Sequence, residues 1–154
     1  MRRTTYSMLD ELMASPTEPL SAEKRQHQLV RMFSALDNLV KADSPTKEDW
    51  RLCSDAVNMV ESLIEMEVCQ DESGLLMDAI TALAKAGKRN LDGKPIRLDG
   101  QGLTAVRGIL NDYADLLAVI PARVMIRCHR RTEKRIFDIL RGKKQPHDVE
   151  IVSR

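Results

Sequence analysis

Apolar side chains recur along most of the chain at the three- and four-residue spacing of amphipathic helices. The pattern predicts five helices, separated by short polar or proline-containing breaks. Their expected ranges are 22–42, 47–68, 72–86, 101–119 and 121–141. We therefore predict an all-α fold, a helical bundle of about five helices. It forms a single helical domain over 21–154, preceded by an N-terminal arm, 1–20.

Residues suited to helix ends support these limits. Ser21 and Asp99 are good N-caps, and Thr46 opens a capping box. Gly87 is expected to end the third helix as a C-terminal cap. Pro121 either kinks one long helix or opens a new one. Because proline costs about 3 kcal/mol inside a helix, two helices are favoured.

Two segments depart from the helical pattern. The arm 1–20 carries enough apolar side chains for a short amphipathic turn, and it either docks on the body or is loosely held. Residues 88–102 contain two Asp-Gly steps and one proline, which indicate turns. Within that connector residues 96–98 alternate like a strand, and we predict a minor two-stranded β ribbon with the alternating tail, 148–152.

Composition agrees with a helical core. Hydrophobic residues make up 43% of the chain but aromatic residues only 3%, so the core must be aliphatic, which suits helices better than sheets. Trp50 is interpreted as a core anchor. No apolar run approaches the roughly 20 residues that span a bilayer, and the arm lacks a signal-peptide core. A cytoplasmic location without a membrane partner is therefore expected.

No pattern in the chain supports catalysis. Glycine-rich phosphate loops are absent, and the three histidines are widely scattered. His129 is interpreted as a satisfied, partly buried histidine. The three cysteines, Cys53, Cys69 and Cys128, are far apart, which favours reduced structural thiols over a disulfide framework or a metal site. We predict a non-enzymatic protein with no catalytic residue, cofactor or metal.

Positive charge is concentrated in residues 121–144, which hold nine Arg or Lys against one Glu and one Asp. At about 100° per residue, most of these cations fall on one stripe of the predicted helix. The opposite stripe consists of Met125, Cys128, Thr132, Ile136 and Ile139 and is expected to be buried. The functional interpretation depends on a basic stripe that stands in solvent, unpaired within the molecule. The alternative is a solvated basic face without a partner, or one that pairs with the protein's own acidic helices. The candidate partner-binding residues of the basic stripe are Arg123, Arg127, Arg130, Arg131, Lys134 and Arg141. A second candidate group lies in the connector: Lys88, Arg89, Lys94 and Arg97.

The formal net charge of +1 hides an asymmetry between the two halves of the chain. Residues 1–87 have a net charge of −6, and residues 88–154 have +7. Such a surface suits an acidic or basic protein partner, nucleic acid, or a second copy of the chain as a homodimer. A pI near 7.7 and the lack of aromatic side chains for base stacking argue against a dedicated nucleic-acid domain.

Several short motifs carry a resemblance to small helical proteins of bacterial plasmids, integrative elements and prophages. The motifs are Arg97-Leu98-Asp99-Gly100, Asp112-Tyr113-Ala114, Cys128-His129-Arg130 with Thr132-Glu133, and, over residues 46–98, Trp50 with Ser54-Asp55-Ala56. The family has no catalytic motif, so the resemblance implies no chemistry. It does imply an accessory protein that modulates host machinery, a class that includes inhibitors of CRISPR immunity.

Two functional hypotheses follow. The first is a non-enzymatic, anti-CRISPR-like inhibitor of a mobile genetic element that binds a host protein or ribonucleoprotein complex through charged helix faces. The alternative is a small DNA- or RNA-binding regulator that uses the basic C-terminal helix.

Overall fold

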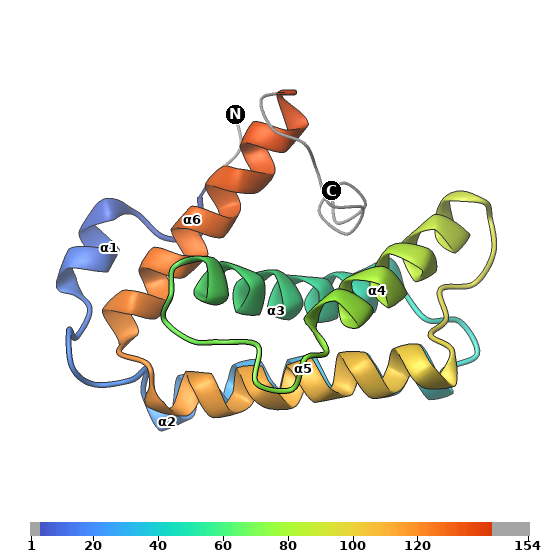
Figure 1. The fold of residues 1–154 in the computed structure, drawn as a ribbon, viewed down its shortest axis with the longest axis horizontal. Coiled ribbons are helices and arrows are strands. Elements are labelled where there is room, and N and C mark those ends of the chain that lie inside the picture. Colours follow the sequence, from blue (N-terminus) through green and yellow to red (C-terminus); the bar gives the residue numbers. More distant parts are fainter. Residues whose placement is uncertain (1–3, 143–154) are drawn as a thin grey trace.

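The computed structural model describes residues 4–142, and within that range it contains six helices and no strand (Figure 1). The helices are α1 (Met8–Met13), α2 (Ala22–Lys41), α3 (Lys47–Glu65), α4 (Leu76–Leu91), α5 (Gly100–Val119) and α6 (Ala122–Leu140). The all-α prediction is confirmed. All five predicted helices are present, and the arm contributes the additional short helix α1.

Helix α3 runs through the centre of the molecule and contacts α2, α4, α5 and α6. Helices α2 and α5 pack against each other on one side of α3, and α6 leaves the bundle at the end where α1 packs on it (Figure 1). The largest fully buried side chains come from α2 to α5: Leu36, Leu39, Trp50, Leu63, Leu83, Ile109, Leu110 and Leu117. These four helices therefore form the body on which α6 and α1 are placed.

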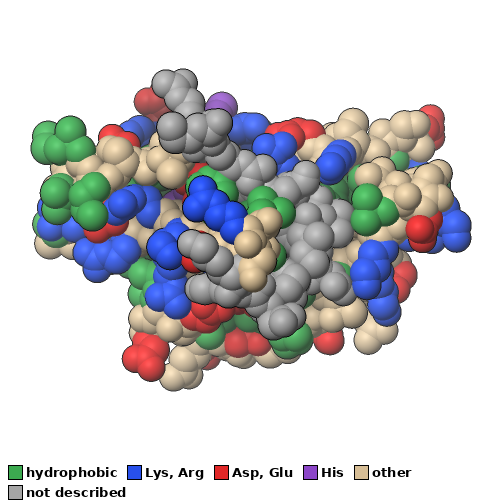
Figure 2. Space-filling model, turned by 90° about the horizontal axis from the view of Figure 1, so that it is seen from above, with side chains coloured by type: hydrophobic (Ala, Val, Ile, Leu, Met, Phe, Trp, Pro, Cys, Tyr) green, Lys and Arg blue, Asp and Glu red, His purple; other side chains and the backbone are tan. Residues whose placement is uncertain are grey.

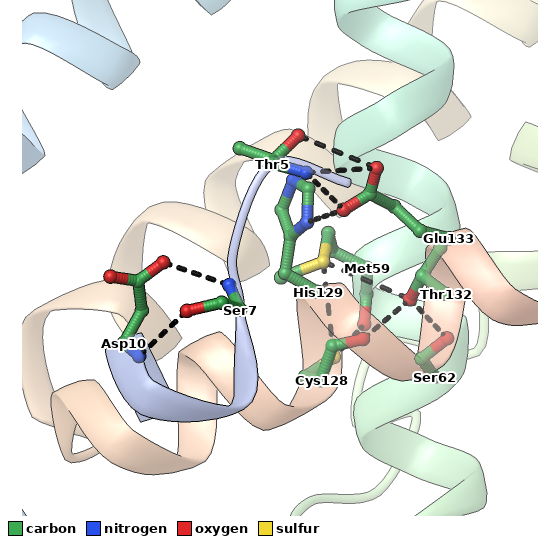
Figure 3. A network of polar contacts seen from close by, with 9 residues as sticks. All are labelled: Thr5, Ser7, Asp10, Met59, Ser62, Cys128, His129, Thr132 and Glu133. Atoms are coloured by element: carbon green, nitrogen blue, oxygen red, sulfur yellow. Dashed lines mark hydrogen bonds and ion pairs between the residues drawn. The ribbon is translucent and has the colours of Figure 1, made fainter. Parts of the chain in front are cut away.

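The apolar stripe predicted for the last helix joins α6 to α3. Met125, Cys128 and Ile136 are buried as expected. Thr132 belongs to the same stripe, and its hydroxyl lies 2.7 Å from the hydroxyl of Ser62 on α3 (Figure 3). The Thr132 hydroxyl also lies 2.8 Å from the carbonyl oxygen of Cys128, so both buried hydroxyl groups have hydrogen-bond partners.

The three helix starts predicted from the capping residues Ser21, Thr46 and Asp99 are confirmed. The side chains of Ser21, Thr46 and Asp99 each accept a hydrogen bond from the first turn of the helix that follows. Pro121 is the N-cap of α6, and Ile120 before it has extended backbone angles. Two separate helices, rather than one kinked helix, therefore meet at Pro121.

The predicted helix 72–86 is wrong at both ends. Gly74 has a φ of 70°, so the chain turns there and α4 begins after it. Gly87 lies buried inside α4, because helix packing outweighs the roughly 1 kcal/mol cost of an interior glycine. The glycine that closes the helix is Gly93, which follows the C-cap Asp92 and has a φ of 77°; the next amide, that of Lys94, donates to the Arg89 carbonyl at 2.8 Å.

Helix α3 also ends earlier than expected, at Glu65 rather than residue 68. Glu67 adopts a φ of 60°, and the amide of Val68 donates to the carbonyl of Leu63 at 3.0 Å. This is the closing pattern of a Schellman motif, formed here without glycine, which is why the sequence does not signal it.

Trp50 is fully buried, and its indole Nε1 donates to the carbonyl of Leu83 at 2.8 Å. The interpretation of Trp50 as a core anchor is confirmed. The bond links α3 to α4 and satisfies the one polar group of the ring.

The β ribbon is not supported. Residues 96–98 are not a strand: Ile96 is buried in the core, and Arg97 Nη2 donates to the carbonyl of Asp43 at 3.2 Å. The proposed partner, 148–152, lies outside the described residues. No helix in the described part of the chain combines the length and apolarity that crossing a membrane requires.

Candidate interaction surface

The arm is tied to the start of α6 by backbone hydrogen bonds. The amide of Ala122 donates to the carbonyl of Glu18 at 2.8 Å, and the amide of Arg123 donates to the carbonyl of Ser15 at 3.0 Å. Arg123 Nη2 reaches the carbonyl of Leu12 at 2.8 Å. These bonds satisfy amides that every helix start leaves unpaired, so the arm docks on the body with α1 beside the first half of α6 (Figure 1).

Glu11 lies at the centre of this contact. It is the one buried residue of α1, and its carboxylate accepts from Arg130 Nη1 at 2.9 Å and from Arg127 Nε at 3.2 Å. Burial alone would raise the pKa of Glu11. The hydrogen bonds and charges of Arg130 and Arg127 outweigh burial and lower that pKa below its ordinary value.

Sequence reasoning did not find Glu11. The apolar spacing of the arm predicts a short amphipathic turn but does not indicate that an acidic residue is the one it buries. A signal for the helix itself was present: Ser7 and Asp10 form a capping box, with hydrogen bonds of 2.8 and 3.1 Å (Figure 3).

Other cations of α6 pair with the central helix. Arg131 Nη2 lies 3.4 Å from the carboxylate of Glu65. Arg135, which is only 10% exposed, lies 2.8 Å from Glu65 and 3.1 Å from Glu61. Because Glu61 is buried and the Arg135 side chain is mostly covered, their charges act between α3 and α6 rather than toward solvent.

The expectation of an unpaired basic stripe is therefore wrong. Arg127, Arg130 and Arg131 each pair with a carboxylate, and so does Lys134, whose Nζ lies 3.0 Å from Asp138. The spacing of residues predicts which side chains share one helix face, but not which carboxylates the arm and α3 bring to that face.

Three of these cations remain accessible despite their partners. The side chains of Arg127, Arg131 and Lys134 are 56%, 50% and 78% exposed. Of their ion pairs, only Arg131–Glu65 is exposed on both sides, and such surface pairs contribute about 0–1 kcal/mol, so an anionic partner can compete for Arg131. Arg141 is exposed at the C-cap of α6.

A hollow of about 530 Å³ lies between α1 and α6. Four of the predicted stripe residues line it, together with Met8 of α1 and one carboxylate, that of Glu11. The cations are Arg127, Arg130, Arg131 and Lys134. Positive charge thus exceeds negative charge among the lining residues.

The exposed side of α1 is apolar. At about 100° per residue, its four large apolar side chains span one arc of the helix, on the side away from Glu11. We call them the α1 apolar row: Met8, Leu9, Leu12 and Met13, which are 56%, 66%, 59% and 79% exposed. Figure 2 shows green side chains at the left end of the molecule, where α1 lies, with blue side chains beside them.

Glu133 holds the chain that leads into α1. Its carboxylate accepts from the amide of Thr5 at 3.0 Å and lies 3.1 Å from Nδ1 of His129 (Figure 3). The His129 side chain is 34% exposed, and the ring of Tyr6 meets it edge-on, with 5.2 Å between ring centroids. The interpretation of His129 as a satisfied, partly buried histidine is confirmed.

Most of the candidate connector residues come together at the opposite end of the molecule. Lys88, Arg89 and Arg97 line one hollow of about 520 Å³, joined by Lys85 of α4. Lys94 is exposed but does not line it. The two candidate groups thus form two separate basic sites.

The cysteines are free thiols. Burial raises the pKa of Cys53 and that of Cys128 to about 12, which keeps both protonated and poorly nucleophilic near neutral pH. Among residues 4–142, no three His, Cys, Asp or Glu side chains are grouped so that they could hold a metal ion.

Comparison of the chain with family models, curated proteins and solved structures found no match. The candidate interaction surfaces of the described chain are therefore the two basic hollows and the α1 apolar row.

Proposed function

We propose that the chain is a non-enzymatic interaction protein of a mobile genetic element that docks on a protein subunit of a host nucleoprotein complex and inhibits that complex, as anti-CRISPR proteins do. The docking surface is the α1 apolar row with the basic hollow beside it. The resemblance to small proteins of mobile elements supports the choice of a nucleoprotein target.

The exposure of the α1 apolar row carries this proposal. Leu9, Leu12 and Met13 project from the molecule on a helix whose buried residue is an acid. Contiguous exposed apolar side chains of this kind mark sites of protein interaction, and side chains at i and i+4 of a helix suit an apolar groove. The partner surface is therefore an apolar groove.

The cations beside the α1 apolar row indicate which charge the partner surface carries. Met8 lines the basic hollow and also belongs to the apolar row, so the two features form one surface. Arg127, Arg131 and Lys134 are exposed there. A groove rimmed by carboxylates complements this arrangement, whereas two copies of this face would bring like charges together.

The test is inhibition of purified CRISPR effector complexes, measured as target-DNA binding with and without the chain. The chain is expected to block one complex of a panel. Each leucine buried at an interface contributes roughly 1.5–3 kcal/mol. The double variant Leu9→Glu/Leu12→Glu should therefore weaken inhibition at least about 100-fold.

The matched control is Met77→Glu, which places a carboxylate on an equally exposed apolar position of α4, 59% exposed against 59% for Leu12. It should inhibit like the wild type. Failure of the chain to inhibit any complex of the panel would overturn the proposed function. Full inhibition by the leucine double variant would show that the α1 surface is not the docking site.

The second candidate function is binding of DNA or RNA by α6, supported by the four cations that line one hollow. Charge reversal at Arg127 and Arg130 would also release Glu11, so Arg131→Gln/Lys134→Gln is the cleaner variant. If α6 binds nucleic acid, a mixed-sequence oligonucleotide should bind much more weakly at about 200 mM than at about 50 mM salt, and the variant should reduce that difference.

A further inference from the structure

The second basic hollow is formed where the chain turns back from α4 to α5. One wall is the last turns of α4, and the other is the segment that leads into α5. These elements lie at the end of the molecule opposite α1, together with the loop between α2 and α3 (Figure 1). The hollow measures about 520 Å³, within the roughly 300–1,000 Å³ typical of ligand sites.

Two guanidinium groups are oriented in this hollow by backbone carbonyls. Arg89 Nε donates to the carbonyl of Pro95 at 3.1 Å, and Arg97 Nη2 donates to the carbonyl of Asp43 at 3.2 Å. Each contact leaves further N–H donors on the same guanidinium group. The two side chains are thus held in place while most of their donors are available.

The nature of the partner distinguishes this hollow from the one beside α1. A carbonyl carries no net charge, so it positions a guanidinium group without neutralising it. On α6, by contrast, Arg127 and Arg130 are positioned by the carboxylate of Glu11. Within the described chain, Arg89 and Arg97 therefore keep their full positive charge.

The remaining lining residues leave an excess of positive charge. Lys85 and Lys88 add two cations, while Asp92 and Asp99 add two carboxylates. One oxygen of Asp99 already accepts from the amide of Gly102, as the N-cap of α5. Even without Lys88, the three cations Arg89, Arg97 and Lys85 exceed the two carboxylates.

The chemistry of the hollow selects phosphate. Guanidinium groups present paired donors that match phosphate oxygens, and fixed guanidinium groups lose little side-chain entropy on binding. The other lining residues are Ala82 and Leu98, so no aromatic ring is present for a base to stack on. Recognition would depend on the phosphate rather than on the base.

We propose that the hollow lined by Arg89 and Arg97 between α4 and α5 is a binding site for phosphate groups. The phosphate is carried either by a nucleic-acid backbone, bound without regard to sequence, or by a small phosphorylated molecule. The site shares no residue with the α1 apolar row, so its phosphate binding can be tested separately from the proposed inhibition of a host complex.

Two titrations of the full chain test the site, followed by backbone amide chemical shifts. One uses inorganic phosphate, and the other uses a short mixed-sequence single-stranded DNA. Binding at this hollow should shift the amides of residues 88–92 and 97–99. Arg89→Gln/Arg97→Gln should weaken binding at least tenfold, and Arg89→Lys/Arg97→Lys should restore only part of it, because lysine lacks the paired donors.

Arg107→Gln is the matched control, since Arg107 is an exposed arginine of α5 outside the hollow. It should bind phosphate like the wild type, and amide shifts away from 88–99 should show that each variant is folded. If phosphate competes with DNA for binding, the ligand is the phosphate backbone of a nucleic acid. If the chain binds phosphate but not DNA, the ligand is a small phosphorylated molecule. Absence of both at millimolar phosphate, or unchanged binding by the glutamine double variant, would overturn the proposal.

Discussion

The carboxylate of Glu11 is buried because two guanidinium groups offset the cost of removing its charge from water. Its pKa is lower in the folded protein than the ordinary 4.5, so docking of α1 favours the ionised form. The ionised Glu11 carboxylate therefore contributes fully to the stability of docked α1 above pH 4.5. This contribution is lost as the pH falls through the lower pKa of the folded protein.

We therefore predict that α1 releases from α6 in acid. Amide protection of residues 8–13, corrected for the intrinsic exchange rate at each pH, should be constant from pH 7 to about 5 and fall below about 4. Glu11→Gln should lower that protection at pH 7, by about 1–3 kcal/mol in opening free energy, and remove most of its pH dependence.

Glu18→Gln is the control for this experiment, because Glu18 is an exposed carboxylate on the same arm. It should follow the wild-type pH profile. If Glu11→Gln retained wild-type protection at pH 7, the carboxylate would not be what holds α1.

Two glycines show how closely the helices approach each other. A Cβ on Gly102 of α5 would lie 2.8 Å from the Cβ of Ala82, which is attached directly to the backbone of α4. A Cβ on Gly108 would lie 2.5 Å from Cδ1 of Leu75, the flexible end of a side chain. The first contact can be relieved only by moving a helix, and the second by rotating a side chain.

We expect opposite outcomes for the two alanine variants. Gly102→Ala should lower the free energy of unfolding by about 1–3 kcal/mol, because α4 and α5 must separate. Gly108→Ala should stay within about 1 kcal/mol of the wild type, since alanine gains up to about 1 kcal/mol of helix propensity. Urea denaturation measures both, and a larger loss for Gly108→Ala would contradict this view of the packing.

The elements themselves were largely predictable from the sequence. Helical periodicity and the caps Ser21, Thr46 and Asp99 are local, and they place each helix start that they mark within one residue. The errors arose where tertiary packing overrides a local preference. Gly87 lies inside α4 because packing of this helix in the core outweighs the cost of an interior glycine. Glu67 adopts a positive φ where α3 ends.

Over the whole molecule, part of the charge asymmetry is offset by ion pairs between the two halves of the chain. Glu11, Glu61 and Glu65 belong to the acidic half of the chain, and all three pair with cations of α6 in the basic half. The sequence spacing places the cations of α6 but does not identify these partners, because they lie 66 to 119 residues away. Only the fold brings them together.

The arm supplies the carboxylate that pairs with Arg127 and Arg130 of α6. Removal of the arm should therefore strengthen the binding of anions to α6. Deletion of residues 1–15 removes two arginines and two acids, so the formal net charge stays at +1. The core side chains come from α2 onward, so the remaining body should unfold cooperatively. Arg127 and Arg130, freed from Glu11, become available to anions.

We predict that this deletion tightens binding of a labelled mixed-sequence oligonucleotide by about tenfold at low salt. The slope of log affinity against log salt should steepen by up to about 2, corresponding to two additional phosphate contacts. Fluorescence anisotropy at several salt concentrations measures both quantities. Adding Arg127→Gln/Arg130→Gln to the deletion should abolish the gain, and equal affinity of the deletion variant and the full chain would show that Glu11 does not mask α6.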